Sequence, residues 1–166
     1  MYSYIRFIPR WADPFAVVLL TGRGLLRESY ERRIGQLGLH MIAIHTLWVS
    51  AEDYPLLLGS ADLGLCLHRS SSGFDFPMKV ADMFGSGLPV CAVDYGPCLS
   101  ERIHHGENGL LFKTSAQLAE QLEELFQDFP AQAPLLERLR ESVLAANHYR
   151  WTDAWHEYVR PLFHTP

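Results

Sequence analysis

Five apolar runs recur along the chain, separated by polar or amphipathic stretches that contain turn-forming residues. The runs are residues 15–20, 41–47, 62–68, 88–93 and 109–112. Each run is short and predominantly aliphatic, which is typical of a strand that is buried on both faces of a parallel sheet. The pattern therefore predicts five parallel strands.

Helix signals fill the stretches between these runs. Ser50 with Asp53, and Thr114 with Gln117, have the three-residue spacing of a capping box, and Pro77 suits the first position of a helix. Further helices are expected at residues 25–35, 99–105, 134–146 and 152–162. Strands that alternate with helices across short loops imply right-handed crossovers. The sequence thus predicts an α/β, Rossmann-like fold, in which a parallel sheet carries helices on both faces.

The chain divides into three parts on this layout. Residues 1–14, in which prolines and charged residues interrupt the aromatic ones, are predicted to form an irregular N-terminal segment. Residues 15–130 form the Rossmann-like domain, and prolines near residues 128–134 mark a mild boundary. Residues 131–166 are expected to form C-terminal helices that pack on the same domain.

Composition narrows the classes of function. The chain has 166 residues, 48% of them apolar, which is enough for one buried core. Its net charge is −5 without a basic stripe, which argues against a nucleic-acid partner. Cys66, Cys91 and Cys98 are odd in number and lack metal-ligand spacing; two of them lie inside apolar runs and are predicted to be reduced core residues, so no disulfide framework is expected. No apolar run approaches the ~20 residues of a membrane span, so the sequence predicts no membrane anchor.

Two loops meet at the edge where such sheets bind ligands, outside the carboxyl ends of the strands. They are the turn of Gly22, Arg23 and Gly24, and the loop of residues 68–73. The turn lacks the third glycine of the dinucleotide fingerprint, so NAD is not indicated, and turn geometry alone explains its glycines. His68 ends a strand here and is either a ligand contact or a hydrogen-bonded structural histidine. Trp48, near the same edge, is expected to be a core or packing residue.

The second loop leads into a helix and suits an anion. Ser70, Ser71, Ser72 and Gly73 come just before the helix that begins near Pro77. Lys79 lies in its first turn, where a cation is unfavourable by a few tenths to ~1 kcal/mol unless an anion lies nearby. A phosphate supplies that anion in one interpretation, and Asp75, four residues earlier, supplies it in the other. Asp82, three residues after Lys79, accepts either from ribose hydroxyls or from Lys79.

Several segments taken together resemble one enzyme family. They are LLTGRG at residues 19–24, AEDYPLLLGSADLG at 51–64, LHRSSSGFDFPMKVADMFG at 67–85, LPVCA at 88–92 and ENGL at 107–110. The chain resembles the chitobiosyldiphosphodolichol β-mannosyltransferases, which are GT-B glycosyltransferases, over nearly everything from Val17 onward. The resemblance implies the C-terminal, donor-binding half of a GT-B fold, with residues 15–130 as the nucleotide-sugar-binding domain. By this resemblance, the half that supplies the acceptor site and the membrane anchor is expected to be missing from the chain.

The resemblance also implies a reaction. GDP-mannose would donate mannose, with inversion, to the 4-hydroxyl of a dolichol-diphosphate chitobiose. This β-1,4-mannosyl transfer belongs to early lipid-linked oligosaccharide assembly for N-glycosylation, at the cytosolic face of the endoplasmic reticulum, or in the cytoplasm for a chain without an anchor. The donor-binding residues it implies are Gly22, Arg23, Gly24, His68, Ser70, Ser71, Ser72, Gly73, Lys79 and Asp82. No catalytic residue is identified, because the general base is expected from the absent half, and no metal or cofactor is expected.

Two departures from the family and two alternatives accompany this interpretation. Leu25 stands where relatives often carry proline, and residues 1–14 do not reproduce the strand and loop that normally begin the donor half. Because the acceptor half is expected to be missing, the chain is expected to be catalytically incomplete alone. One alternative is a non-catalytic nucleotide-binding or interaction module that acts by association with another glycosyltransferase. The other is a flavodoxin-like or nucleotide-binding domain unrelated to sugar transfer.

Overall fold

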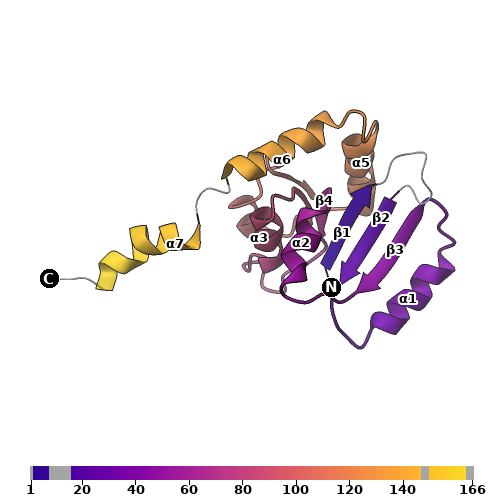
Figure 1. Ribbon diagram of the computed structural model, residues 1–166, viewed down its shortest axis with the longest axis horizontal. Helices are drawn as coiled ribbons and strands as arrows, with labels where there is room; N and C mark the ends of the chain where they lie inside the picture. Colours follow the sequence, from indigo (N-terminus) through magenta and orange to yellow (C-terminus); the bar gives the residue numbers. More distant parts are fainter. Residues whose placement is uncertain (1, 8–15, 147–149, 164–166) are drawn as a thin grey trace.

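A single six-stranded sheet organises the chain, with helices on both of its faces (Figure 1). The computed structural model describes residues 2–7, 16–146 and 150–163, and for residues 2–7 the backbone alone. The strands are β1 (Tyr2–Phe7), β2 (Ala16–Thr21), β3 (Ile42–Leu47), β4 (Leu63–Cys66), β5 (Val90–Val93) and β6 (Gly109–Phe112). The helices are α1 (Arg27–Gln36), α2 (Asp53–Gly59), α3 (Met78–Gly85), α4 (Pro97–Ser100), α5 (Ser115–Phe126), α6 (Pro134–Ala146) and α7 (Trp151–Ala154).

The strand order, β3-β2-β1-β4-β5-β6, places an unpredicted strand inside the sheet. β1 runs antiparallel to both of its neighbours, β2 and β4, whereas every other pair is parallel. The irregular structure predicted for residues 1–14 is therefore wrong for residues 2–7, and residues 8–14 lie outside the described residues. A strand owes much of its stability to cross-strand partners, and local sequence does not show those partners. The five predicted strands and the α/β class are confirmed.

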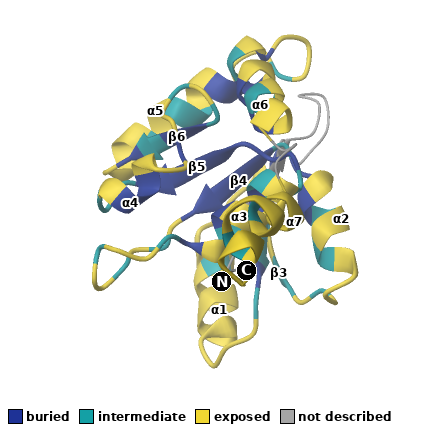
Figure 2. Cartoon of the chain, turned by 90° about the vertical axis from the view of Figure 1, so that its left-hand side faces the viewer, coloured by how far each residue is buried: buried dark blue, intermediate teal, exposed yellow. Residues whose placement is uncertain are grey.

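The core lies around β4, β5 and β6, which are largely buried in Figure 2. Their side chains alternate between two clusters on opposite faces of the sheet. On one face Cys66 and Ala92 pack in a cluster with residues of α2, α3 and α4. On the other face Leu65 and Cys91 pack in a cluster with residues of α5 and α6. All three cysteines are free and buried, whereas the sequence predicted this for two of them. These strands are buried on both sides because helices cover both faces. The buried strands in turn hold the ends of their loops in fixed positions.

Local signals explain where the helices of the core begin. Thr114 and Gln117 form the predicted capping box at the start of α5. Before α2, the Ser50 hydroxyl accepts from the Asp53 N–H at 3.1 Å and donates to the Asp53 carboxylate at 2.8 Å. The helix expected at residues 99–105 is instead the single turn α4, because a hydrogen-bonded turn follows it.

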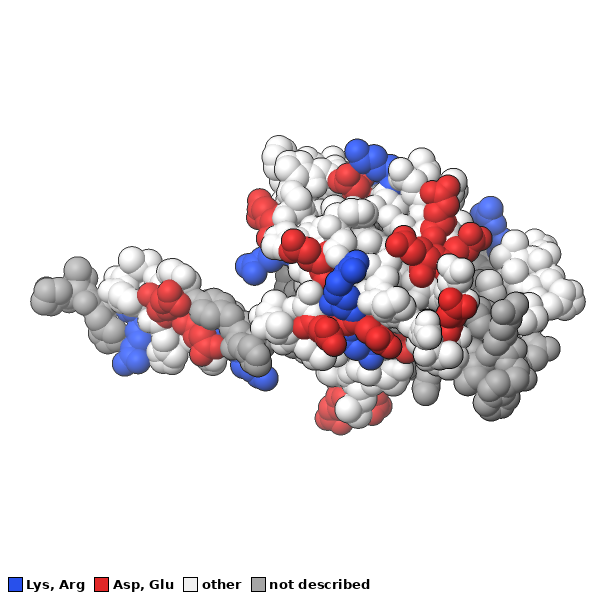
Figure 3. All heavy atoms as spheres, turned by 90° about the horizontal axis from the view of Figure 1, so that it is seen from above, with Lys and Arg blue, Asp and Glu red and all other residues white. Residues whose placement is uncertain are grey.

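The C-terminal residues divide at the end of α6. That helix buries Leu136, Leu139 and Val143 against the rest of the domain. The next described residues begin α7, continue as a π-helix (Trp155–Val159) and end as a 3₁₀-helix (Arg160–Phe163). We call residues 151–163 the C-terminal segment. It stands apart from the body of the protein in Figures 1 and 3, so it differs from the predicted helices packed on the domain.

Candidate functional site

The turn after β2 is tied to the loop after β3. The Gly22 N–H donates to the Leu47 carbonyl at 3.2 Å, and φ at Gly22 is 146°, a conformation that favours glycine. The carbon at the centre of the Arg23 guanidinium lies 4.1 Å from the centroid of the Trp48 ring, a cation–π contact. Trp48 is 53% exposed, so it does not enter the core. Its ring instead holds the Arg23 side chain at the edge of the sheet.

A small cavity of about 220 Å³ opens between these two loops. Its lining residues are Thr21, Gly22, Trp48, Val49, Ser50, Ala51 and Tyr54. A cavity of about 150 Å³ is enough to hold benzene, so this one has room for a larger planar ring. The Thr21 side chain is buried, and its hydroxyl has no hydrogen-bond partner among the described residues. The cavity therefore offers a mostly apolar wall, which is typical of a small-molecule site, whereas the Thr21 hydroxyl is covered by its neighbours. Sequence reasoning missed Thr21, because burial of its hydroxyl is visible only in the packed structure.

The serine loop after β4 is a prebuilt turn. The Ser70 hydroxyl oxygen accepts from the backbone N–H groups of Ser72 at 3.1 Å and Gly73 at 2.8 Å. The Ser72 hydroxyl oxygen accepts from the Phe74 N–H at 3.3 Å and lies 3.1 Å from the Ser70 hydroxyl. Three of the loop N–H groups, those of Ser72, Gly73 and Phe74, are thus engaged by serine oxygens. Ser71 is exposed on the same turn.

His68 and Asp75 close the base of this loop. His68 Nε2 lies 3.0 Å from Asp75 Oδ2, and the His68 ring packs edge-on against Tyr95. Hydrogen bonds from Ser70 and from His68 lower the pKa of the Asp75 carboxyl from its usual value. Desolvation is the main cause that raises the pKa of Tyr95 to about 12, so its hydroxyl stays protonated and donates to the Asp75 carbonyl at 2.7 Å. In the interpretation of His68 as a structural histidine, its hydrogen-bond partner is Asp75. Tyr95, in the loop after β5, also belongs to the site.

The first turn of α3 carries Lys79, as the sequence predicts. Lys79 is half-buried there and is close enough to Cys66 for its charge to act on that thiol. Asp82 follows one turn later on the exposed surface of α3, where desolvation raises the pKa of its carboxyl. The sequence interpretation considered Asp75 only as a partner of Lys79. In the structure the Asp75 carboxylate contacts His68 and Ser72.

Strand order sets the separation of the two loops. β1 lies between β2 and β4, so the turn of residues 22–24 and the loop of residues 68–73 follow strands two spacings apart, or roughly 10 Å. A ligand with a ring at one end and a charged centre could span that distance. Among the described residues, no group of three or more His, Cys, Asp or Glu is placed to hold a metal ion. No helix in the same part of the chain is long and apolar enough to cross a membrane.

Comparison with protein families and curated proteins finds close relatives. Residues 4–128 match the family "Glycosyl transferases group 1". The chain is 52% identical over 149 residues to the mouse chitobiosyldiphosphodolichol beta-mannosyltransferase, covering 90% of this chain and 31% of that protein. It is 49% identical over 150 residues to the Arabidopsis thaliana UDP-glycosyltransferase TURAN, with 90% and 32% covered. The chain thus spans about a third of the length of the curated relatives it matches.

Solved structures share the fold at low sequence identity. The Anabaena protein Alr3699/HepE in complex with UDP superposes with a TM-score of 0.63 at 19% identity, over 87% of this chain and 40% of that one. The C-terminal domain of the group 1 glycosyl transferase LpcC from Francisella tularensis gives a TM-score of 0.53 at 20% identity, over 80% and 62%. The sheet and its helices therefore have the arrangement found in glycosyltransferase domains.

Proposed function

The chain belongs to the glycosyl transferases group 1 family, and from that premise we propose that it is the donor-binding part of a β-mannosyltransferase that uses GDP-mannose. The observation that carries the proposal is the pairing of a ring-sized cavity with two cationic side chains at one sheet edge. The cavity lies beside Arg23, and Lys79 begins the helix that follows the serine loop. A nucleoside diphosphate has the matching parts, a planar base and a dianionic centre.

We place the guanine in the cavity of about 220 Å³, against Trp48 and Tyr54. The diphosphate then extends toward the serine loop, where Arg23 approaches from one side and Lys79 from the other. The Ser70 and Ser72 hydroxyls, already 3.1 Å apart, supply further donors. Asp82 accepts from the ribose hydroxyls in this arrangement, and such hydrogen bonds would offset the desolvation that raises the pKa of its carboxyl.

Transfer of mannose leaves negative charge on the departing GDP, and positive groups placed in advance stabilise that charge. Arg23 and Lys79 are the groups for this role, so the proposal uses no metal ion. The hydroxyl that attacks, and the base that takes its proton, come in this proposal from an acceptor domain with a lipid-linked chitobiose. In that setting the reaction is a step of lipid-linked oligosaccharide assembly for N-glycosylation, at the cytosolic face of the endoplasmic reticulum.

A thermal-unfolding titration tests donor binding. A ligand at a hundredfold excess over its dissociation constant stabilises by ~2.7 kcal/mol, which corresponds to roughly 5–10 °C for a chain of this size. GDP and GDP-mannose should produce this shift and UDP a smaller one. No shift with millimolar GDP, in protein that circular dichroism shows to be folded, would refute the proposal. A shift with FMN or NAD in place of GDP would favour a domain unrelated to sugar transfer.

A transfer assay separates the donor part of an enzyme from a non-catalytic module. Holding donor and acceptor in attacking geometry supplies much of the rate of such a reaction. The chain alone should therefore release no GDP in an acceptor-dependent manner from GDP-mannose and lipid-linked chitobiose. Addition of an acceptor half from a relative should restore transfer. Donor binding with no transfer under either condition would favour the non-catalytic module.

A further inference from the structure

The loop after β5 holds the serine loop from one side. Tyr95 donates its hydroxyl to the Asp75 carbonyl at 2.7 Å. The Cys98 thiol, in the first turn of α4, donates to the Gly73 carbonyl at 3.3 Å and lies 3.6 Å from the Asp75 carbonyl. These contacts join residues 20 to 25 positions apart in the sequence. Residues 95–98 therefore fix two carbonyl groups on the stretch that leads from the serine loop to α3.

The two loops also approach each other along the backbone. A Cβ placed on Gly96 would lie 3.1 Å from the Gly73 carbonyl oxygen, which is tighter than most contacts of a side-chain carbon. A glycine at this position leaves room for the carbonyl, and any larger residue would push it away. The position of the Gly73 carbonyl thus depends on this glycine as well as on the thiol.

His68, after β4, holds the same stretch from the other side. Its Nε2 lies 3.0 Å from Asp75 Oδ2, and its ring packs edge-on against the Tyr95 ring with centroids 5.8 Å apart. Asp75 is therefore held at its carbonyl by Tyr95 and at its carboxylate by His68, and these two side chains contact each other.

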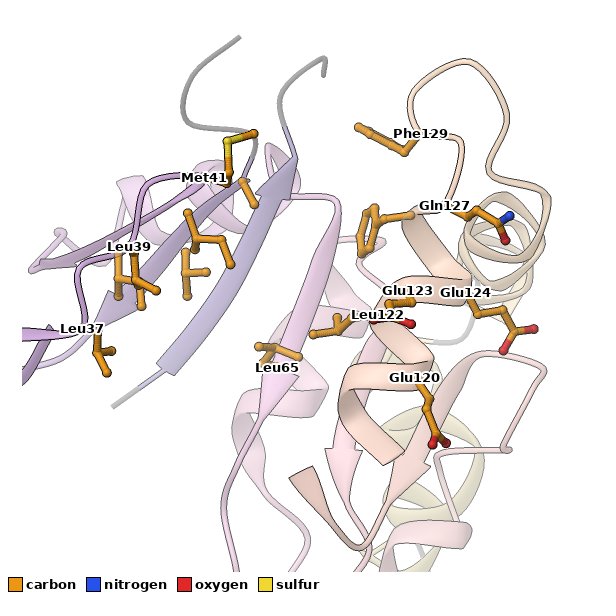
Figure 4. Close-up of a pocket in the computed structure, with 15 residues that line it drawn as sticks. Leu37, Leu39, Met41, Leu65, Glu120, Leu122, Glu123, Glu124, Gln127 and Phe129 are labelled. Atoms are coloured by element: carbon orange, nitrogen blue, oxygen red, sulfur yellow. The ribbon is translucent and has the colours of Figure 1, made fainter. Parts of the chain in front are cut away.

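Cys98 connects the serine loop to the core. It is 8% exposed and packs in one cluster with Cys66 of β4 and Val80 of α3. The large pocket that Figure 4 shows is lined instead by Leu65 and Leu122, which belong to the cluster on the other face of the sheet. The sheet therefore separates Cys98 from that pocket, and a change at Cys98 acts on the side of the serine loop.

The hydrogen bonds within the serine loop have a different effect from these contacts. The Ser70 hydroxyl accepts from the N–H groups of Ser72 and Gly73, which closes the turn on itself. Bonds of that kind give the turn its shape but do not place it on the sheet. The contacts of Tyr95 and Cys98 tie the turn to the neighbouring loop of the same sheet edge, so they set where its hydroxyl groups lie.

We propose that Tyr95 and Cys98 are positioning residues of the donor site, which hold the serine loop in the form that binds the diphosphate. This inference rests on the proposed donor site, and it assigns the two side chains no contact with the donor. A loop that is ordered before binding does not lose that freedom on binding, so the affinity is higher. When only a fraction of the molecules has the competent loop, the apparent Kd rises by the inverse of that fraction. Loss of either contact should therefore weaken donor binding.

Calorimetric titration of the full chain with GDP tests the proposal. Tyr95→Phe removes the hydroxyl but keeps the ring against His68, and it should raise the Kd for GDP roughly 3- to 10-fold, the factor that one neutral hydrogen bond represents. Cys98→Ala should have an effect of similar size. Cys98→Ser should bind GDP more tightly than Cys98→Ala, because serine restores a donor. Tyr158→Phe, at an exposed position on the C-terminal segment, is the matched control and should bind as the wild type does.

A third variant moves the loop without removing a donor. Gly96→Ala places its Cβ against the Gly73 carbonyl and should also raise the Kd for GDP, whereas Gly35→Ala, with open space around it, should not. Hydrogen exchange in the absence of GDP measures the loop directly. The amides of Ser72 and Gly73 should exchange faster in Tyr95→Phe than in the wild type, and those of β5 should not, because only the loop has lost a contact.

The wild type and the variants fail in distinguishable ways. A wild type that does not bind GDP refutes the proposed function, and the positioning role falls with it. If the wild type binds GDP and Tyr95→Phe binds it equally well, the positioning role is overturned while the donor site stands. If Cys98→Ser binds no more tightly than Cys98→Ala, packing is the cause and the role of Cys98 is overturned. Thermal unfolding without GDP shows which variants fold, and Tyr95→Phe decides alone where a Cys98 variant does not.

Discussion

Replacing Lys79 by alanine tests whether the serine loop and α3 hold the diphosphate of the donor. The ammonium group stands in the first turn of α3, at the positive end of the helix dipole, where a bound anion compensates for it. A charge-assisted hydrogen bond to phosphate contributes ~1.5–3 kcal/mol. At ~1.4 kcal/mol for each factor of ten, the dissociation constant for GDP should rise roughly 10- to 150-fold in the Lys79→Ala variant.

The same substitution should have little effect on the unliganded fold. Alanine is the best helix former, and loss of a cation from the first turn of a helix removes an unfavourable interaction with its dipole. The unfolding free energy should therefore change by ~1 kcal/mol or less, equivalent to roughly 2–4 °C in the melting temperature. Isothermal calorimetry with GDP, together with thermal unfolding in its absence, separates the two effects.

Arg138→Ala is the matched control. Arg138 is exposed on α6, outside the site, and its loss changes the net charge by the same amount as the loss of Lys79. If general attraction between the protein and GDP were the cause, both variants would bind GDP equally weakly. The reasoning fails in that case, and it also fails if Lys79→Ala binds GDP as tightly as the wild type, since Lys79 would then serve only the protein.

Three further predictions follow from other contacts. Trp48→Ala removes the ring under Arg23, a contact worth ~0.5–1 kcal/mol, so calorimetry should show GDP binding weakened roughly 2- to 5-fold; an unchanged affinity would contradict the role of Trp48. Gly64→Ala would place a Cβ 2.5 Å from the sulfur of buried Met83. Scanning calorimetry should therefore show that the unfolding free energy falls by ~1–3 kcal/mol, or that the melting temperature falls by roughly 3–10 °C. Gly59→Ala, with open space around it, is the control and should show no loss. Because the pKa of the Asp75 carboxyl is lowered, its charged form stabilises the fold at pH values above the ordinary carboxyl pKa, and this contribution disappears as the pH falls through the lowered value. In the Asp75→Asn variant, the melting temperature should therefore depend less on pH on the acid side. If the curves of melting temperature against pH superimpose for the variant and the wild type, the pair with His68 does not act on stability.

The parts of the fold that the sequence predicts are those with a local cause. A continuous apolar run such as Val90–Val93 marks a buried strand whatever its neighbours are, and the Thr114 capping box marks the start of α5 before any packing is known. β1 has no such signal, since its stability comes from pairing with β2 and β4. The exposed C-terminal segment shows the same limit, because an apolar helical face does not state which surface it covers.

The candidate site also contains features with a local cause and contacts that depend on the folded chain. The sequence places Gly22, the serine loop and Lys79 at one edge, because strand ends and helix starts are local features. The contact of Arg23 with Trp48 depends on the parallel register of β2 and β3, which brings together residues 25 positions apart. The pair of His68 and Asp75 likewise depends on how the loop folds back on itself. Contacts of this kind set the roles of individual side chains, and only the folded chain shows them.

The direction of β1 decides which groups can reach a diphosphate at this edge. A parallel strand in that position would end at the edge and lead into a loop whose N–H groups could face an anion. β1 runs the other way, so it starts at this edge and continues to the opposite one. The N–H groups of Ser72 and Gly73 are engaged by the Ser70 hydroxyl. In the proposed donor site, the diphosphate charge would therefore rest largely on the side chains of Arg23 and Lys79 and on the serine hydroxyls.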